Sequence, residues 1–102
     1  MKVKNKNYIN NDWVDAIDGK TFEVENPFTE KVIAKVPYSQ EKDVDRAVLA
    51  AKVAWKDWKS LGSLDMRDLL REIAVKSREH DREIAKIIVA ESGKPLIECL
   101  DE

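Results

Sequence analysis

The stretch VDRAVLAAKVAWKDW, residues 44–58, decides how the rest of this sequence is interpreted. Its apolar residues recur at intervals of three and four, which places them on one stripe of a helix with 3.6 residues per turn. Ser39 is a suitable N-cap before it, and Glu41 and Asp43 suit the positive first turn. The pattern predicts an amphipathic helix over residues 40–59. We expect its inner face to bury Val48, Ala51, Trp55 and Trp58.

Two similar stripes follow this helix. Gly62 interrupts the first helix and Ser63 is a suitable cap for the next, so we expect helices over residues 64–79 and 81–92. Gly93 is a suitable left-handed stop. Pro95 can take the first position of a fourth helix, which has room for only about two turns before the sequence ends.

Upstream of the helices, residues 8–36 alternate between apolar and polar side chains, as strands with one buried face do. Asn10 and Asn11 suit a tight hairpin because asparagine tolerates positive φ. Phe22 and Val24 share one face of a later strand, which we expect to be buried, and Pro27 should end that strand. The order of elements is therefore short strands first and helices afterwards.

Composition narrows the possible classes of protein. A chain of 102 residues with 43% apolar residues can form one packed domain, and no apolar run approaches the ~18 residues of a membrane span. The net charge is −2 and charges of both signs are interspersed, which argues against a nucleic-acid partner. With one cysteine and one histidine, neither an internal disulfide nor a four-ligand zinc site of these residues can form. We expect a cytoplasmic protein with no membrane or nucleic-acid partner.

Five blocks of the sequence, in order and in spacing, resemble the amino-terminal fifth of the aldehyde dehydrogenase superfamily. They are YINNDWV at 8–14, TFEVENP at 21–27, DVDRAV with its following alanines and tryptophans at 43–58, Arg67 with its apolar neighbours up to Ala74, and ESGKPL at 91–96. None of these blocks is specific to the superfamily by itself, but five of them in the same order and spacing are. Two positions depart from the family pattern, because Asn11 and Glu30 stand where glycine is usual.

The resemblance implies an α/β fold in which residues 1–102 form an incomplete amino-terminal part of the coenzyme-binding domain. Members of that family oxidise an aldehyde to an acid through a cysteine thiohemiacetal and transfer hydride to NAD or NADP. Their catalytic cysteine, glutamate and dinucleotide turn match positions beyond residue 102. We therefore assign no catalytic and no cofactor-binding residue, and expect the chain alone to be inactive and to bind no cofactor. We also expect a homo-oligomer, because apolar surface from Leu96, Cys99, Leu100 and the inner faces of the helices would otherwise remain exposed.

The resemblance further implies a monovalent cation site. Many members hold such an ion with backbone carbonyls before the Asn-Pro turn and an acid before the Gly-Lys-Pro block, which match Val24, Glu25 and Glu91 here. Oxygen ligands suit a hard cation, and an acid at a helix carboxyl end is otherwise unfavourable against the dipole. The alternative is that Glu91 is an ordinary exposed glutamate.

Four other kinds of residue invite a functional interpretation. Cys99 lies on an apolar stripe with Leu96 and Leu100, so a buried small hydrophobe is favoured over a nucleophile. His80 falls at a helix junction and Lys94 follows a helix end, where capping and dipole roles are the simpler interpretations. The tryptophans favour packing rather than base stacking, because no basic groove accompanies them.

One alternative from another functional class remains. The hairpin and helices could be a free-standing interaction module that acts through its apolar faces. Such a module should be monodisperse with one defined partner state, whereas an orphaned segment of an enzyme should associate through surfaces that its missing core would cover.

Overall fold

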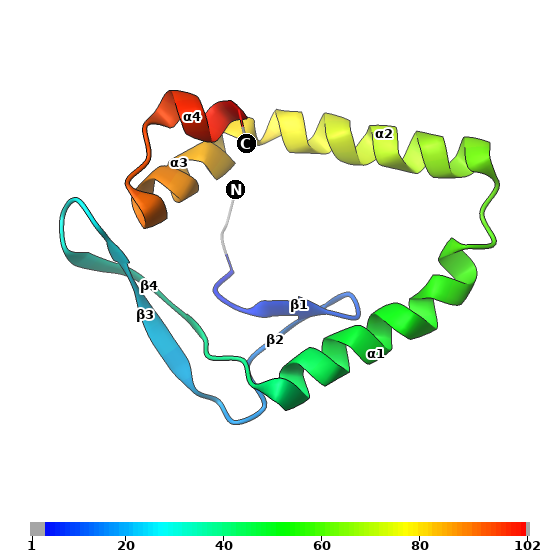
Figure 1. The fold of residues 1–102 in the computed structure, drawn as a ribbon, viewed down its shortest axis with the longest axis horizontal. Coiled ribbons are helices and arrows are strands. Elements are labelled where there is room, and N and C mark those ends of the chain that lie inside the picture. Colours follow the sequence, from blue (N-terminus) through cyan, green and yellow to red (C-terminus); the bar gives the residue numbers. More distant parts are fainter. Residues whose placement is uncertain (1–3, 102) are drawn as a thin grey trace. The chain divides into compact units, whose positions relative to one another are not determined.

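The computed structural model describes residues 4–101 and contains short strands followed by helices, as the sequence predicted (Figure 1). The elements are β1 (Asn7–Ile9), β2 (Asp12–Val14), β3 (Thr21–Asn26), β4 (Lys31–Pro37), α1 (Glu41–Trp58), α2 (Ser63–Glu79), α3 (Asp81–Ser92) and α4 (Leu96–Asp101). The described residues form two compact units. One holds residues 4–24 and 34–61, and the other holds residues 25–33 and 62–101.

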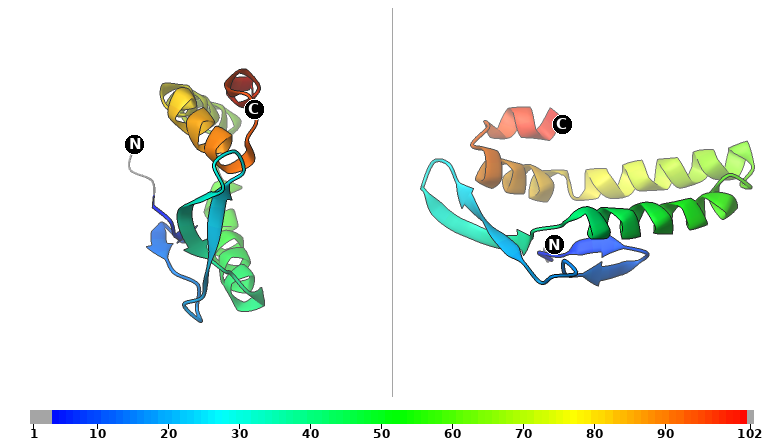
Figure 2. Two further views of the ribbon diagram at one scale, coloured as in Figure 1. Left: turned by 90° about the vertical axis from the view of Figure 1, so that its left-hand side faces the viewer. Right: turned by 60° about the horizontal axis from the view of Figure 1, so that its bottom comes forward.

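In the first unit, β1 and β2 form an antiparallel hairpin that packs against α1 (Figures 1 and 2). Tyr8 pairs with Trp13 across the strands, and the turn residues Asn10 and Asn11 take left-handed φ values of 52° and 64°. Asparagine tolerates this conformation better than most residues, so the hairpin does not require the glycine that the family pattern has there. Ile9 is on the opposite side of the strand from Tyr8 and is buried.

The start of α1 differs in detail from the sequence prediction. The N-cap is Gln40 rather than Ser39, and the Gln40 backbone N–H donates to Asp43 Oδ2 at 2.9 Å. Ser39 Oγ instead accepts a hydrogen bond from Asn7 Nδ2 at 2.8 Å. The serine hydroxyl is therefore used to hold the hairpin, and a carboxylate three residues into the helix satisfies the cap backbone.

In the second unit, α3 and α4 pack against each other, and α2 ends where α3 begins. The expected cap Ser63 is the first residue of α2, and Gly62 with extended ψ is the N-cap. His80 is both the C-cap of α2 and the N-cap of α3, as its place at the junction indicated. Gly93 ends α3 with a φ of 72°, which confirms the left-handed stop.

The turn between β3 and β4 is also part of the second unit. Asn26 Oδ1 accepts the backbone N–H groups of Phe28 and Thr29, and the Asn26 carbonyl accepts that of Glu30. Glu30 has a φ of 57°, so it adopts the conformation that glycine usually supplies at this place in the family pattern. Pro27 lies against Gly93, where an added Cβ would be 3.0 Å from Pro27 Cγ.

The prediction that α1 buries Val48, Ala51, Trp55 and Trp58 is wrong for this structure. Trp55 is 58% exposed and Trp58 37%, and Val48 and Ala51 are also exposed. Phe22 is 48% exposed and Val24 is half-buried, so the expected buried face of β3 is only partly covered. Of the described elements, β1 has the most extensive contact with α1, and three residues of hairpin cover little of an 18-residue helix. The stripe is present, but most of it has no partner.

Candidate functional site

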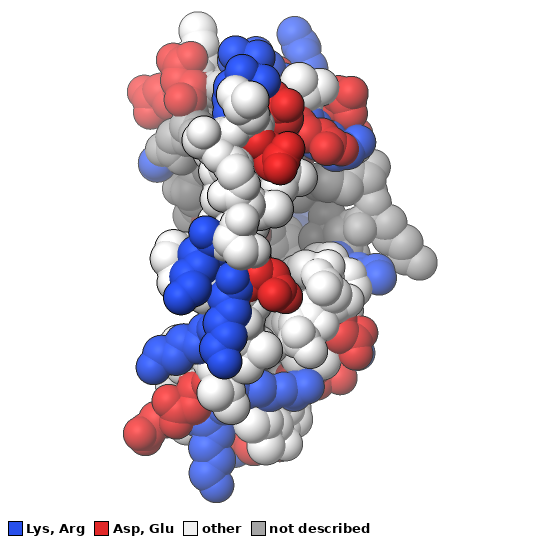
Figure 3. All heavy atoms as spheres, turned by 90° about the vertical axis from the view of Figure 1, so that its right-hand side faces the viewer, with Lys and Arg blue, Asp and Glu red and all other residues white. Residues whose placement is uncertain are grey.

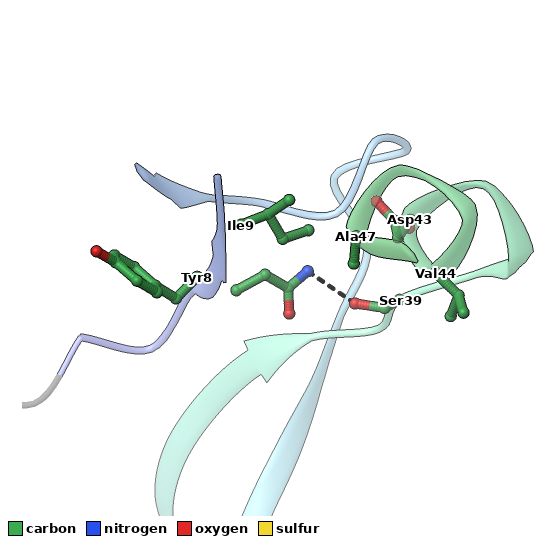
Figure 4. Close-up of a pocket in the computed structure, with 7 residues that line it drawn as sticks. Tyr8, Ile9, Ser39, Asp43, Val44 and Ala47 are labelled. Carbon is green, nitrogen blue, oxygen red and sulfur yellow. Dashed lines mark hydrogen bonds between the residues drawn. The ribbon is translucent and has the colours of Figure 1, made fainter. Parts of the chain in front are cut away.

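One hollow of the first unit lies between β1 and the beginning of α1 (Figure 4). It has a volume of about 270 Å³ and is lined by Asn7, Tyr8, Ile9, Ser39, Asp43, Val44 and Ala47. The hydrogen bond from Asn7 to Ser39 crosses it. Within this lining the hydroxyl and the amide bind each other, so the hollow presents chiefly apolar surface and acts as a packing site for the hairpin.

Asp43 is the buried acid of this unit, with an exposed fraction of 3%. Its Oδ1 accepts the backbone N–H of Ile17 at 2.9 Å, and its Oδ2 accepts that of Gln40 at the same distance. A carboxylate with both oxygens bound to backbone donors is fixed in place. Its role is to hold the loop before β3 against the start of α1. In the sequence, this role of Asp43 is indicated only by an acid at the third position of a helix, a pattern that also suits compensation of the helix dipole.

The three residues of the expected cation site fall on the elements that the sequence indicated. Val24 and Glu25 are in the second half of β3, half-buried and exposed respectively, and Glu91 is exposed in the last turn of α3. Glu25 and Glu91 belong to the same unit, in which Pro27 lies against Gly93. Among residues 4–101, no three acidic, histidine or cysteine side chains are grouped so that they could hold a metal ion.

Cys99 is buried, as its apolar stripe predicted. Only 4% of it is exposed, and its Sγ lies 4.0 Å from the carbonyl oxygen of Lys94. It therefore fills space between α4 and the segment before it. His80 Nδ1 lies 3.6 Å from Glu83 Oε1, an exposed pair within the first turn of α3, which fits the junction role rather than a catalytic one.

The tryptophans occupy two different environments. Trp13 packs on Tyr8 with ring centroids 4.9 Å apart, and the Lys4 ammonium lies 5.2 Å from the Trp13 ring. Trp55 and Trp58 instead line an open hollow on the second half of α1. Neither environment places a basic groove beside the rings, and acidic and basic side chains both occur over the face that Figure 3 shows. None of the helices in the described part of the chain is long and apolar enough to cross a membrane.

Comparison with known sequences decides the family. A sequence model of the aldehyde dehydrogenase family matches residues 13–102. The chain belongs to the aldehyde dehydrogenase family. This confirms the resemblance that the five blocks indicated.

Several relatives match nearly the whole chain. Malonate-semialdehyde dehydrogenase 1 of Geobacillus kaustophilus is 38% identical over 95% of this chain, which spans 20% of that protein. A solved aldehyde dehydrogenase mutant from Bacillus cereus is also 38% identical and has a TM-score of 0.89 over 98% of this chain and 21% of its own. A betaine aldehyde dehydrogenase mutant from Staphylococcus aureus, solved in complex with NAD+, is 29% identical with a TM-score of 0.88 over 95% of this chain and 20% of its own.

The fold class predicted from the sequence is thereby confirmed, because the solved relatives contain the same order of short strands and helices. The chain spans about one fifth of the length of the curated relatives it matches.

Proposed function

We propose that residues 1–102 serve as the amino-terminal part of the coenzyme domain of an NAD(P)-dependent aldehyde dehydrogenase. The observation that carries this proposal is the family match over residues 13–102 together with a TM-score of 0.89 to a solved member at 38% identity. In this role the hairpin and helices cover and brace the nucleotide-binding core. The residues of this chain contribute packing and position rather than the reacting groups.

The reaction of the longer protein would be oxidation of an aldehyde to a carboxylic acid. A cysteine thiolate adds to the carbonyl, hydride passes to NAD or NADP, and a glutamate activates water to release the acid. The relatives act on different aldehydes, such as malonate semialdehyde and 3-sulfolactaldehyde by their names, so the proposal specifies an aldehyde and no finer substrate. We assign none of these catalytic roles to residues of this chain.

A chimeric enzyme tests the proposal. The matching fifth of the Bacillus cereus aldehyde dehydrogenase is replaced by this chain, and reduction of NAD+ is followed with an aldehyde that the unmodified enzyme oxidises. We expect the chimera to fold and to retain kcat/KM within about 100-fold of the unmodified enzyme, a loss of less than ~2.7 kcal/mol. A folded chimera without dehydrogenase activity would contradict the proposal.

The isolated chain gives a complementary test. We expect it to show no saturable binding of NAD+ or NADP+ by calorimetric titration, because the dinucleotide turn and the catalytic residues of the family match positions beyond this sequence. Binding with a micromolar dissociation constant would contradict our assignment of no cofactor-binding residue.

The cation site remains part of the proposal. The carbonyl oxygens of Val24 and Glu25 and the carboxylate of Glu91 would supply oxygen ligands of the kind that a monovalent cation takes, and the ion would offset the unfavourable position of Glu91 at the end of α3. Its role would be structural. In the chimera, replacing K+ by a bulky organic cation should lower the unfolding temperature, and Glu91→Gln should remove most of that dependence on K+.

We also propose that the protein is cytoplasmic and forms homo-oligomers. The support for self-association is exposed apolar surface on α4, where Leu96, Ile97 and Leu100 are 44%, 74% and 38% exposed. Monomers rarely expose a continuous apolar patch of more than a few hundred Å². Sedimentation velocity over a concentration series would test this, and a single monomeric species up to ~100 μM, well above a dissociation constant of order 1 μM, would contradict it.

A further inference from the structure

Two segments that are distant in the sequence meet at a glycine in the second unit. Gly93 follows α3, and Pro27 begins the turn between β3 and β4 (Figure 1). A Cβ added to Gly93 would lie 3.0 Å from Pro27 Cγ and 3.9 Å from Pro27 Cβ. The shorter distance is below the ~3.5–4.0 Å at which carbon atoms pack best. A side chain on residue 93 would therefore push the two segments apart.

The turn side of this contact is held by its own hydrogen bonds. Asn26 Oδ1 accepts the backbone N–H groups of Phe28 at 2.9 Å and of Thr29 at 3.2 Å. The Asn26 carbonyl oxygen accepts the N–H of Glu30 at 2.8 Å. These bonds close the turn around Pro27, whose ring also fixes its own φ. A displacement of Pro27 is therefore transmitted to the end of β3.

The helix side of the contact is fixed as well. The Gly93 backbone N–H donates to the Val89 carbonyl oxygen at 2.9 Å, and the Ser92 hydroxyl donates to the Ile88 carbonyl oxygen at 2.6 Å. Both bonds hold the last turn of α3. The contact therefore joins two segments that cannot yield without weakening their own hydrogen bonds.

The contact also lies close to two residues of the candidate cation site. Glu25 precedes Pro27 by two residues, and Glu91 precedes Gly93 by two residues. Two residues span at most ~7 Å of extended chain and ~3 Å along a helix, so both glutamates lie within a short reach of the contact. All four residues belong to the same compact unit. A cation that binds an oxygen from each glutamate depends on the separation of the two segments.

We propose that Gly93 is a positioning residue for the monovalent cation, a role that rests on the cation site in the proposed function. Because residue 93 has no side chain, Pro27 rests directly on the end of α3. This contact sets the distance between the Glu25 carbonyl oxygen and the Glu91 carboxylate, which are the ligands that this unit supplies. Replacing residues that hold metal ligands in place typically changes metal affinity about 10–100-fold.

The alternative is that Gly93 serves only as the left-handed stop of α3. Gly19 provides a matched control, because its φ is 70° and the φ of Gly93 is 72°, but a Cβ added to Gly19 meets no described atom within 4 Å. Alanine at either position has the same unfavourable left-handed backbone. At Gly93 it also meets Pro27. Backbone strain does not depend on K+, so the affinity for K+ separates a positioning role from a purely structural one.

The test is the stabilisation of this full chain by K+. Urea denaturation is followed over a series of KCl concentrations, with tetramethylammonium chloride keeping the ionic strength constant, and the rise in unfolding free energy gives the dissociation constant of K+. We expect Gly93→Ala to raise this dissociation constant about ten-fold or more, and Gly19→Ala to change it less than about two-fold. Equal dissociation constants for the two variants would overturn the positioning role. The cation site itself would stand if Glu91→Gln still removed the stabilisation by K+.

A second substitution keeps the proposal testable if Gly93→Ala by itself weakens the fold. Pro27→Ala removes the Cγ atom that the added side chain would meet. In that background Gly93→Ala should raise the dissociation constant of K+ less than about three-fold, because the two residues act through one contact. An equal effect of Gly93→Ala in both backgrounds would overturn the contact as the cause. If K+ stabilises neither this chain nor the chimera, the cation site is removed and the positioning role with it, whereas the proposed dehydrogenase function is unaffected.

Discussion

Two helical regions of this molecule have equally clear apolar stripes in the sequence, but the stripes differ in how far they are buried in the structure. In the contact between α3 and α4, Ala85 is completely buried and Cys99 nearly so. On α1, the larger side chains Trp55 and Trp58 remain exposed. A stripe predicts which side of a helix avoids water, but burial also requires an element to pack against it. The difference separates a helix face that a neighbouring element covers from one that other described residues leave largely exposed.

The largest effect should come from Asp43, which both supports the start of α1 and holds the loop before β3. Asp43→Ala leaves the part-buried N–H groups of Ile17 and Gln40 without their acceptor, and we expect a loss of about 2–3 kcal/mol in unfolding free energy. Urea denaturation monitored by circular dichroism is the measurement. Asp45→Ala, at an exposed position of the same helix, is the control and should change stability by less than ~0.5 kcal/mol.

A smaller difference in unfolding free energy is expected between alanine variants of two glycines that have nearly the same φ. Gly93→Ala places a Cβ 3.0 Å from Pro27 Cγ at a φ of 72°, so we expect a loss of about 2 kcal/mol from strain and crowding together. Gly19→Ala has a φ of 70° but nothing within 4 Å, so it should lose only the backbone contribution of about 1 kcal/mol. If both variants lose the same amount in chemical denaturation, the packing of Pro27 on Gly93 contributes nothing.

The next prediction compares the substitution of Trp55 in the isolated chain with the same substitution in the chimera. In the isolated chain Trp55→Ala should cost less than ~1 kcal/mol, because more than half of the side chain is already in water. In the covalent chimera, where we expect further polypeptide to cover the stripe of α1, the same change should cost ~3–5 kcal/mol as for a buried aromatic residue. Thermal unfolding of both pairs tests this, and equal costs in the two contexts would remove the distinction between the open and the covered stripe.

The smallest effect is expected at Phe28, on the tip of the β3–β4 turn. It is 91% exposed, and its backbone N–H rather than its ring takes part in the turn. Phe28→Ser should therefore change the unfolding free energy by less than ~0.5 kcal/mol. A larger loss would mean that the Phe28 ring, which is not part of the stripe of α1, also packs against other residues in solution.

The sequence was sufficient for features that depend on neighbours along the chain. The order of strands and helices, the left-handed stop at Gly93 and the junction at His80 all follow from local preferences, and the structure has each of them. The burial of Cys99 also followed, because its partner helix is the preceding element. The exposure of Trp55 could not be predicted, because it depends on which surface covers α1.

The predictions of the two helix N-caps were wrong for a different reason. Ser39 and Ser63 are both good N-cap residues, yet Ser39 binds Asn7 of a distant strand and Ser63 lies inside α2. A cap preference of about 1 kcal/mol is easily outweighed by another hydrogen bond or by a shift of one residue. The candidate cation residues are a third case, because a site built largely from backbone carbonyls leaves almost no signal in side-chain types.

The turn between β3 and β4 has a consequence for the order of folding. All of its hydrogen bonds join Asn26 to residues within four positions, so closing it requires almost no loop entropy. Hairpins of this kind form in about 1–10 μs, far faster than contacts between distant segments. During synthesis the turn emerges well before α3, so it can close before Gly93 leaves the ribosome. The contact between Pro27 and Gly93 then requires only that α3 reach the turn.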